Sequence, residues 1–217
     1  LYLPRLIIAA ASGENTVSMH HAVANTQTLW FMTSVTGVRP IVTTRNIPDA
    51  LVSVRDDLLA THTPDGSSFA AKALADNYAV PFTSKRMWDA FRVASPDEQM
   101  DMIIDLYGPW YFAFAASWED VDAEKTHPVH FLRYEDMIAD EPAVFADALA
   151  FLDSSLDRAA IDAALAEVYG GPKTAYRFNV GKTGRGRDGL TTGQLDRLVA
   201  LARHFADDGL IERYVEA

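Results

Sequence analysis

The sequence predicts an α/β fold in which a mainly parallel sheet is flanked by helices. A β-branched apolar run, Arg39 to Thr44, predicts a strand, and a helical pattern over Ile47 to Ala60 follows it at once. A second apolar run, Val129 to Tyr134, is followed by the amphipathic segment Pro142 to Leu152. Strands that alternate with helices are typical of a parallel sheet. The length of 217 residues suits one domain with a sizeable core, spanning residues 1–217.

Further patterns lie before the first strand and after the second helix. Leu6 to Ala11 is apolar and fits a strand or a helix end, and Thr16 to His21 predicts a short strand. Ala22 to Thr36 and Leu156 to Val168 have helical patterns.

Two further helices carry start signals in their first turns. Ser95, with Pro96 at the first helical position and Glu98 three residues on, forms a capping box. We expect Gly108-Pro109 to interrupt this helix and an aromatic helix to resume over Trp110 to Trp118. Thr191 and Gln194 also have capping-box spacing, and they predict a last helix that ends near Ala206, with Gly209 just beyond it.

Composition excludes several classes of function. A formal net charge of -11 argues against a nucleic-acid partner. No apolar run is long enough to predict a membrane span, and no signal peptide is evident. The chain has no cysteine, which excludes disulfides and thiolate chemistry and fits a reducing, cytoplasmic compartment. The basic residues cluster near the C-terminus, where a local positive patch predicts a site for a small anion: Lys173, Arg177, Lys182, Arg185 and Arg187.

The strongest candidate site follows the first predicted strand. Arg45 stands at the end of that strand, and Ser53 lies eight residues later, two turns into the predicted helix. A guanidinium fork and a short hydroxyl suit a terminal phosphate. Asp49 lies between them and is placed either to hold the turn or to orient the arginine. The alternative is a buried strand whose following Arg and Asp form an ordinary surface pair.

Two more segments carry chemistry. Tyr134-Glu135-Asp136 follows the second strand, and an aromatic ring that packs at the strand end is the ordinary interpretation of Tyr134. The segment from Arg177 to Asp188 combines glycines, which allow close backbone approach to an anion, with Lys182 and Arg185; otherwise it is a solvated loop.

The order of these three segments resembles that of the sulfotransferases that use 3′-phosphoadenosine 5′-phosphosulfate (PAPS). The resemblance extends from about His20 to about Ala206 and implies a P-loop-kinase-like fold. It implies that Arg45 and Ser53 bind the 3′-phosphate and that Tyr134 lies against the adenine. It also implies that the glycine-basic segment closes the site, through these residues: Gly181, Lys182 and Arg185.

The chain departs from the family pattern in two places. The usual Arg-Lys pair of the C-terminal loop is replaced by Asn179-Val180, so that Arg177, Lys182 or Arg185 has to supply the charge; Gly-Arg-Gly here is similar to bacterial branches of the family. Residues 1–20 do not match the family's phosphosulfate loop, so either that loop lies upstream or the protein is a non-catalytic relative.

The resemblance implies transfer of a sulfuryl group from PAPS to a hydroxyl or amine by direct in-line displacement, without a metal and with PAP as product. His21, or else His20, would be the general base, because a histidine titrates near neutral pH. The acceptor would be a small molecule, a carbohydrate or a lipid-like compound, bound by residues 61–118, which are rich in aromatic side chains. Two alternatives stay open, a non-catalytic PAP-binding protein and a P-loop kinase relative. A homodimer is among the oligomeric states left open.

Overall fold

The structure is a computed structural model that describes residues 23–35, 37, 39–60, 85–153, 157–170 and 182–216. Its contacts divide the chain into two compact units. The first unit comprises residues 1–44 and 121–182, and the second comprises residues 45–120 and 183–217. Each unit has a hydrophobic cluster of its own.

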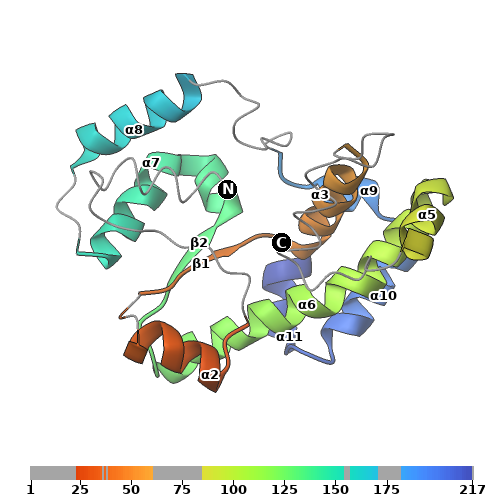
Figure 1. Cartoon of the computed structure of the whole chain (residues 1–217), viewed down its shortest axis with the longest axis horizontal. Coiled ribbons are helices and arrows are strands. Elements are labelled where there is room, and N and C mark those ends of the chain that lie inside the picture. The colour runs from red at the N-terminus through yellow and green to blue at the C-terminus, as the bar shows by residue number, and fades with distance from the viewer. Residues whose placement is uncertain are drawn as a thin grey trace. The chain divides into compact units, whose positions relative to one another are not determined.

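The first unit contains a parallel pair of strands. β1 (Ile41–Thr44) and β2 (His130–Arg133) lie side by side, paired from Ile41 opposite His130 to Thr44 opposite Arg133 (Figure 1). Both strands fall within the segments predicted from sequence, and the parallel pairing confirms the predicted α/β class.

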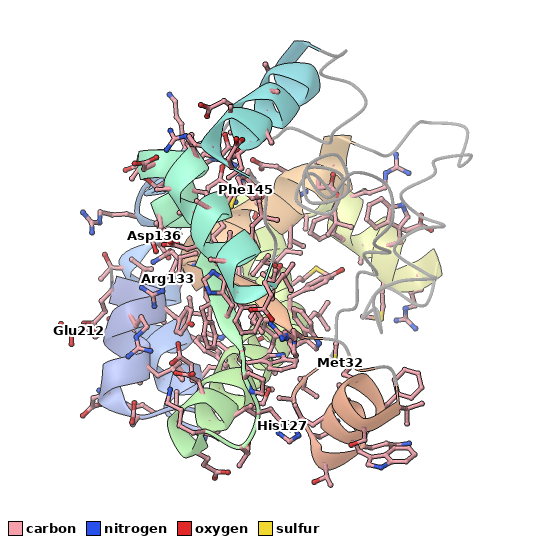
Figure 2. All side chains as sticks on the ribbon, turned by 90° about the vertical axis from the view of Figure 1, so that its left-hand side faces the viewer. Met32, His127, Arg133, Asp136, Phe145 and Glu212 are labelled. Carbon is pink, nitrogen blue, oxygen red and sulfur yellow. The ribbon has the colours of Figure 1, made fainter. Side chains whose placement is uncertain are left out.

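Two helices of the first unit follow β2. α7 (Tyr134–Phe151) begins directly after the strand, with Arg133 and Asp136 at the junction and Phe145 further along the helix (Figure 2), and α8 (Arg158–Gly170) packs against it. The buried side chains shared by β2, α7 and α8 are those of Leu132, Phe145, Ala148, Leu149, Ile161 and Leu165.

α7 begins at Tyr134, whereas the sequence predicted a helix that begins at Pro142, and α7 bends just before Pro142. Asp140 has non-helical torsion angles (φ -151°, ψ 77°), two residues before Pro142. A proline inside a helix has no N–H to donate and its ring displaces the preceding turn, so a bend is expected there. The Asp140 carboxylate accepts a hydrogen bond from the Ala143 N–H at 3.2 Å and thereby caps the second half.

The N-terminal helix is shorter than predicted. α2 (Thr26–Leu29) begins after Asn25, whose side chain accepts a hydrogen bond from the Thr28 N–H at 2.9 Å, and it continues as the π-helical segment η1 (Trp30–Val35). The strands predicted at residues 6–11 and 16–21 lie outside the described residues.

The described part of the second unit consists of helices. They are α3 (Ile47–Ala60), α5 (Lys85–Val93), most of α6 (Pro96–Glu124), α9 (Arg185–Gly189), α10 (Thr192–Ala202), α11 (Asp208–Ile211) and the π-helical segment η3 (Glu212–Glu216). α3 has the bounds that the sequence predicted. The most deeply buried side chains of this unit are Leu51, Phe91, Ile103, Ile104, Phe112, Leu198 and Ala202.

The predicted interruption of α6 at Gly108-Pro109 is wrong. α6 begins with the predicted capping box, in which the Ser95 N–H donates to Glu98 at 2.8 Å, and then passes through Pro109 without a break. An internal proline costs roughly 3 kcal/mol, so the helix must gain more from packing. Gly108 provides part of that packing, because a Cβ there would lie 3.0 Å from a Leu201 methyl of α10.

α10 begins at the predicted capping box and ends earlier than predicted. The Thr191 side chain accepts from the Gln194 N–H at 3.2 Å, while the Gln194 side chain accepts from the Thr191 N–H at 3.0 Å. The helix ends at Ala202, and Phe205 then donates to the Ala202 carbonyl in a tight turn. Gly209, expected beyond the helix, lies inside α11. Within the described residues, no helix is both long enough and apolar enough to cross a bilayer.

The capping box of α10 should contribute measurably to stability. Thr191→Ala removes one half of the reciprocal cap, and we expect it to lower the free energy of unfolding by about 1 kcal/mol. Thr192→Ala is the matched control, since Thr192 is exposed at the first helical position and makes none of the cap hydrogen bonds. Urea titrations of both variants test this, and an equal effect in the two would contradict it.

His130 should make stability depend on pH. Its ring stacks on Phe151, with centroids 5.5 Å apart, and burial lowers its pKa below the ordinary value of 6.5, while nearby Asp147 acts in the opposite direction. The unfolded chain therefore takes up a proton that the folded chain resists. As far as His130 is concerned, the free energy of unfolding is highest above about pH 6.5. It decreases as the pH falls from there through the lower pKa of the folded state.

We expect the free energy of unfolding to fall less steeply below about pH 6.5 in His130→Phe than in the wild type. Asp147→Asn should have the opposite effect, because it removes the charge that offsets part of the pKa depression. Urea titrations at several pH values test both variants. Parallel pH profiles in all three proteins would contradict the assignment.

Candidate anion site on helix α3

The site starts where Arg45 and Asn46 connect β1 to α3. The Asn46 side chain accepts a hydrogen bond from the Asp49 N–H at 3.1 Å, which satisfies one of the free N–H groups of the first turn. Its amide group lies 3.5 Å from the Val215 carbonyl near the C-terminus, in donor geometry. The predicted placement of Arg45 before the helix and of Ser53 in its second turn is confirmed.

Asp49 connects α3 to the glycine-basic segment. Its carboxylate accepts hydrogen bonds from the Gly184 N–H at 2.8 Å and from the Gly186 N–H at 2.6 Å, one on each oxygen. The Arg45 guanidinium lies 3.6 Å from the oxygen that binds Gly184. Asp49 is only 1 % exposed, and a buried carboxylate is stable only when donors of this kind surround it. Sequence reasoning had assigned Asp49 to the turn or to the arginine and had missed this long-range role.

Residues Gly184 to Leu190, which we call the α9 segment, pack closely on α3 (Figure 1). Gly184 has a left-handed backbone with φ +79°, which favours glycine. A Cβ on Gly186 would lie 2.3 Å from the Pro48 Cβ and 2.8 Å from the Asp49 nitrogen. Gly186 therefore allows the close approach of the α9 segment to the first turn of α3, and Gly184 provides the left-handed backbone just before it.

A second contact joins the same two elements further along α3. The Arg185 guanidinium contacts the Asp56 carboxylate, which also lies 3.2 Å from the Arg55 guanidinium. Asp49, Ser53 and Asp56 are spaced four and three residues apart, so they lie on one face of the helix. Asp56 is half-buried and binds two arginines.

The other predicted site residues belong to the first unit or lie outside the described residues. Tyr134 is half-buried at the first residue of α7 in the first unit, and Lys182 is exposed. His20, His21 and Gly181 lie outside the described residues.

Of the aromatic residues expected to form an acceptor pocket, two belong to the core of the second unit. Phe91 is fully buried, and Trp88 stacks on it with ring centroids 5.6 Å apart. Trp110 and Tyr111 are half-buried and pack edge to face.

Among the residues that the structure describes, no group of three or more His, Cys, Asp or Glu side chains is placed to hold a metal ion.

The arrangement on α3 is chemically suited to an anion. Arg45 is partly accessible, with 19 % of its side chain exposed, and it precedes a helix of 14 residues whose N-terminus carries a partial positive charge. Ser53 adds a hydroxyl on the face that the α9 segment covers. The carboxylate of Asp49 repels an anion less strongly because each of its two oxygens already accepts a hydrogen bond.

Substitution of Gly186 should separate close packing from helix propensity. Gly186→Ala places a methyl group against the backbone of α3, and we expect it to lower the free energy of unfolding by about 2–3 kcal/mol. Gly193→Ala is the matched control, because nothing lies within 4 Å of a Cβ at that position of α10. Its stability should be unchanged or higher, as alanine favours helix. Urea titration distinguishes the two, and a tolerated Gly186→Ala would contradict the close approach.

Comparison with known proteins supports a sulfotransferase-like fold. No protein-family model matches the sequence, and no curated protein matches it. Among solved structures, the chain is similar to the crystal structure of mouse sulfotransferase SULT7A1 complexed with PAP, with a TM-score of 0.51 and 16 % sequence identity. The match covers 84 % of this chain and 65 % of that one, so the chain spans slightly less than two thirds of the neighbour's length. At this identity the likeness concerns the fold, which is the α/β fold of the sulfotransferases.

Proposed function

We propose that this chain is a PAPS-dependent sulfotransferase whose 3′-phosphate site lies on α3. One observation carries the proposal. Asp49 and Gly184, which are 135 residues apart in the sequence, are joined by a hydrogen bond. They belong to the two segments that resemble the phosphate-binding parts of sulfotransferases. Segments that serve one ligand have to lie together in the fold, and these two do.

The chemistry of the donors supports a phosphate. Arg45 offers a planar guanidinium, which binds phosphate oxygens in pairs, and Ser53 offers a hydroxyl. The N-terminus of α3 adds backbone N–H groups and a favourable dipole. The similar mouse sulfotransferase was solved with PAP, and we infer that PAP is also the product bound by this chain.

The remaining roles rest on the sequence. In the proposed reaction the acceptor hydroxyl or amine forms a bond to sulfur while the bond from sulfur to the 5′-phosphate oxygen of the nucleotide breaks. His21, or else His20, takes the proton that the acceptor loses. Tyr134 lies against the adenine, and Gly181, Lys182 and Arg185 close the site over the 3′-phosphate.

Arg45→Ala tests the phosphate site. We expect it to weaken PAP binding by about 2–5 kcal/mol, since a charged ligand group loses its partner. Arg92→Ala is the matched control, because it removes the same charge from the same unit. Arg92 is an exposed arginine in the last turn of α5. Isothermal titration calorimetry with PAP measures both. Equal losses in the two variants would mean that only net charge matters.

The same calorimetry, with a sulfuryl-transfer assay, separates the alternative functions. The proposal expects the wild type to bind PAP more tightly than ATP, because ATP has no 3′-phosphate for Arg45 and Ser53. Tighter binding of ATP would favour a P-loop kinase relative. Binding of PAP without transfer from PAPS to any hydroxyl or amine acceptor would favour a non-catalytic PAP-binding protein.

A further inference from the structure

We propose that Asp49 is a positioning residue of the nucleotide site, which it serves by holding the α9 segment against α3 beside Arg45. This inference rests on the proposed function. It adds a role for a carboxylate that does not itself touch the ligand, since an anion would be repelled by it.

The geometry of Asp49 suits a positioning role. Each carboxylate oxygen accepts one backbone N–H, from Gly184 at 2.8 Å and from Gly186 at 2.6 Å. Two hydrogen bonds to neighbouring parts of one segment fix both its position and its direction on the helix. Both bonds are to a charged acceptor that is almost fully buried, and such bonds are stronger than those between neutral groups.

The α9 segment is bound on both sides of Ser53. Asp49, one turn before Ser53, binds its backbone, and Asp56, one turn after Ser53, binds the Arg185 side chain. The three α3 residues share a face, so the segment crosses the helix where the proposed phosphate ligand Ser53 lies. The position of the segment therefore decides which groups surround a phosphate bound by Arg45 and Ser53.

The sign of one effect distinguishes positioning from simple electrostatics. Asp49 carries a negative charge 3.6 Å from the Arg45 guanidinium. If only charge mattered, replacing Asp49 with a neutral residue would strengthen the binding of an anion. If Asp49 positions the α9 segment, the same replacement weakens binding, because the two glycines donate to different oxygens and asparagine has an NH2 donor in place of one of them.

The experiment compares Asp49→Asn with Asp57→Asn in the full chain. Asp57→Asn removes the same charge from the same helix and leaves in place the contacts of Asp49 and Asp56 to the α9 segment. Calorimetry measures PAP affinity, and hydrogen–deuterium exchange measures protection of residues 183–190 without any ligand. We expect Asp49→Asn to exchange faster in residues 183–190 and to bind PAP roughly tenfold more weakly or worse. Asp57→Asn should keep wild-type protection and should bind PAP at least as tightly as the wild type.

Asp56→Asn provides a second variant if Asp49→Asn does not fold. It weakens the contacts of Asp56 to Arg185 and Arg55 and leaves both backbone hydrogen bonds to Asp49 in place. It should therefore weaken PAP binding by a smaller factor, although loss of a negative charge by itself would favour an anion. Binding of PAP by the tested variant that is as tight as in the wild type, or tighter, would overturn the inference and leave the proposed function intact. If the wild-type protein does not bind PAP, both the inference and the proposed function are overturned. This result differs from the previous one, in which the wild type still binds PAP.

Discussion

The packing of the α9 segment on α3 depends on the burial of one carboxylate. Asp49 is removed from water in the first turn of α3, and it is stable there because two backbone N–H groups of a distant segment donate to it. This requirement determines the neighbouring residues. Gly186 has no room for a side chain against Pro48, and Gly184 has the left-handed backbone that brings the segment round to the carboxylate.

The same interaction explains how an acidic protein can offer a site for a polyanion. The chain has a net charge of -11, so its overall field opposes a nucleotide with several phosphate charges. Local chemistry must overcome this. The negative charge of Asp49, which lies beside Arg45, is neutralised in part by the N–H dipoles of Gly184 and Gly186. The N-terminus of α3 adds a further dipole that favours an anion. The proposed sulfotransferase function thus rests on an arrangement of a few groups.

Tertiary packing also overrides local rules elsewhere in the fold. α6 continues through Pro109, although proline interrupts helices by its geometry, and Gly108 beside it allows Leu201 of α10 to approach closely. By contrast, α7 bends two residues before Pro142, and there the Asp140 side chain caps the second half. Both prolines lie inside helices, so the presence of a proline does not by itself decide between continuation and a bend.

The sequence by itself determined the features that have local causes. The capping boxes at Ser95 and Thr191, the bounds of α3, the two strands and the placement of Arg45 and Ser53 all follow from side chains within a few residues of one another. Only the tertiary structure decided that Asp49 binds Gly184 and Gly186, that Arg185 binds Asp56 and that Phe91 is core. Such contacts join residues far apart in the chain and leave no periodic pattern or local spacing. Their energy depends on burial, which exists only once the chain has folded.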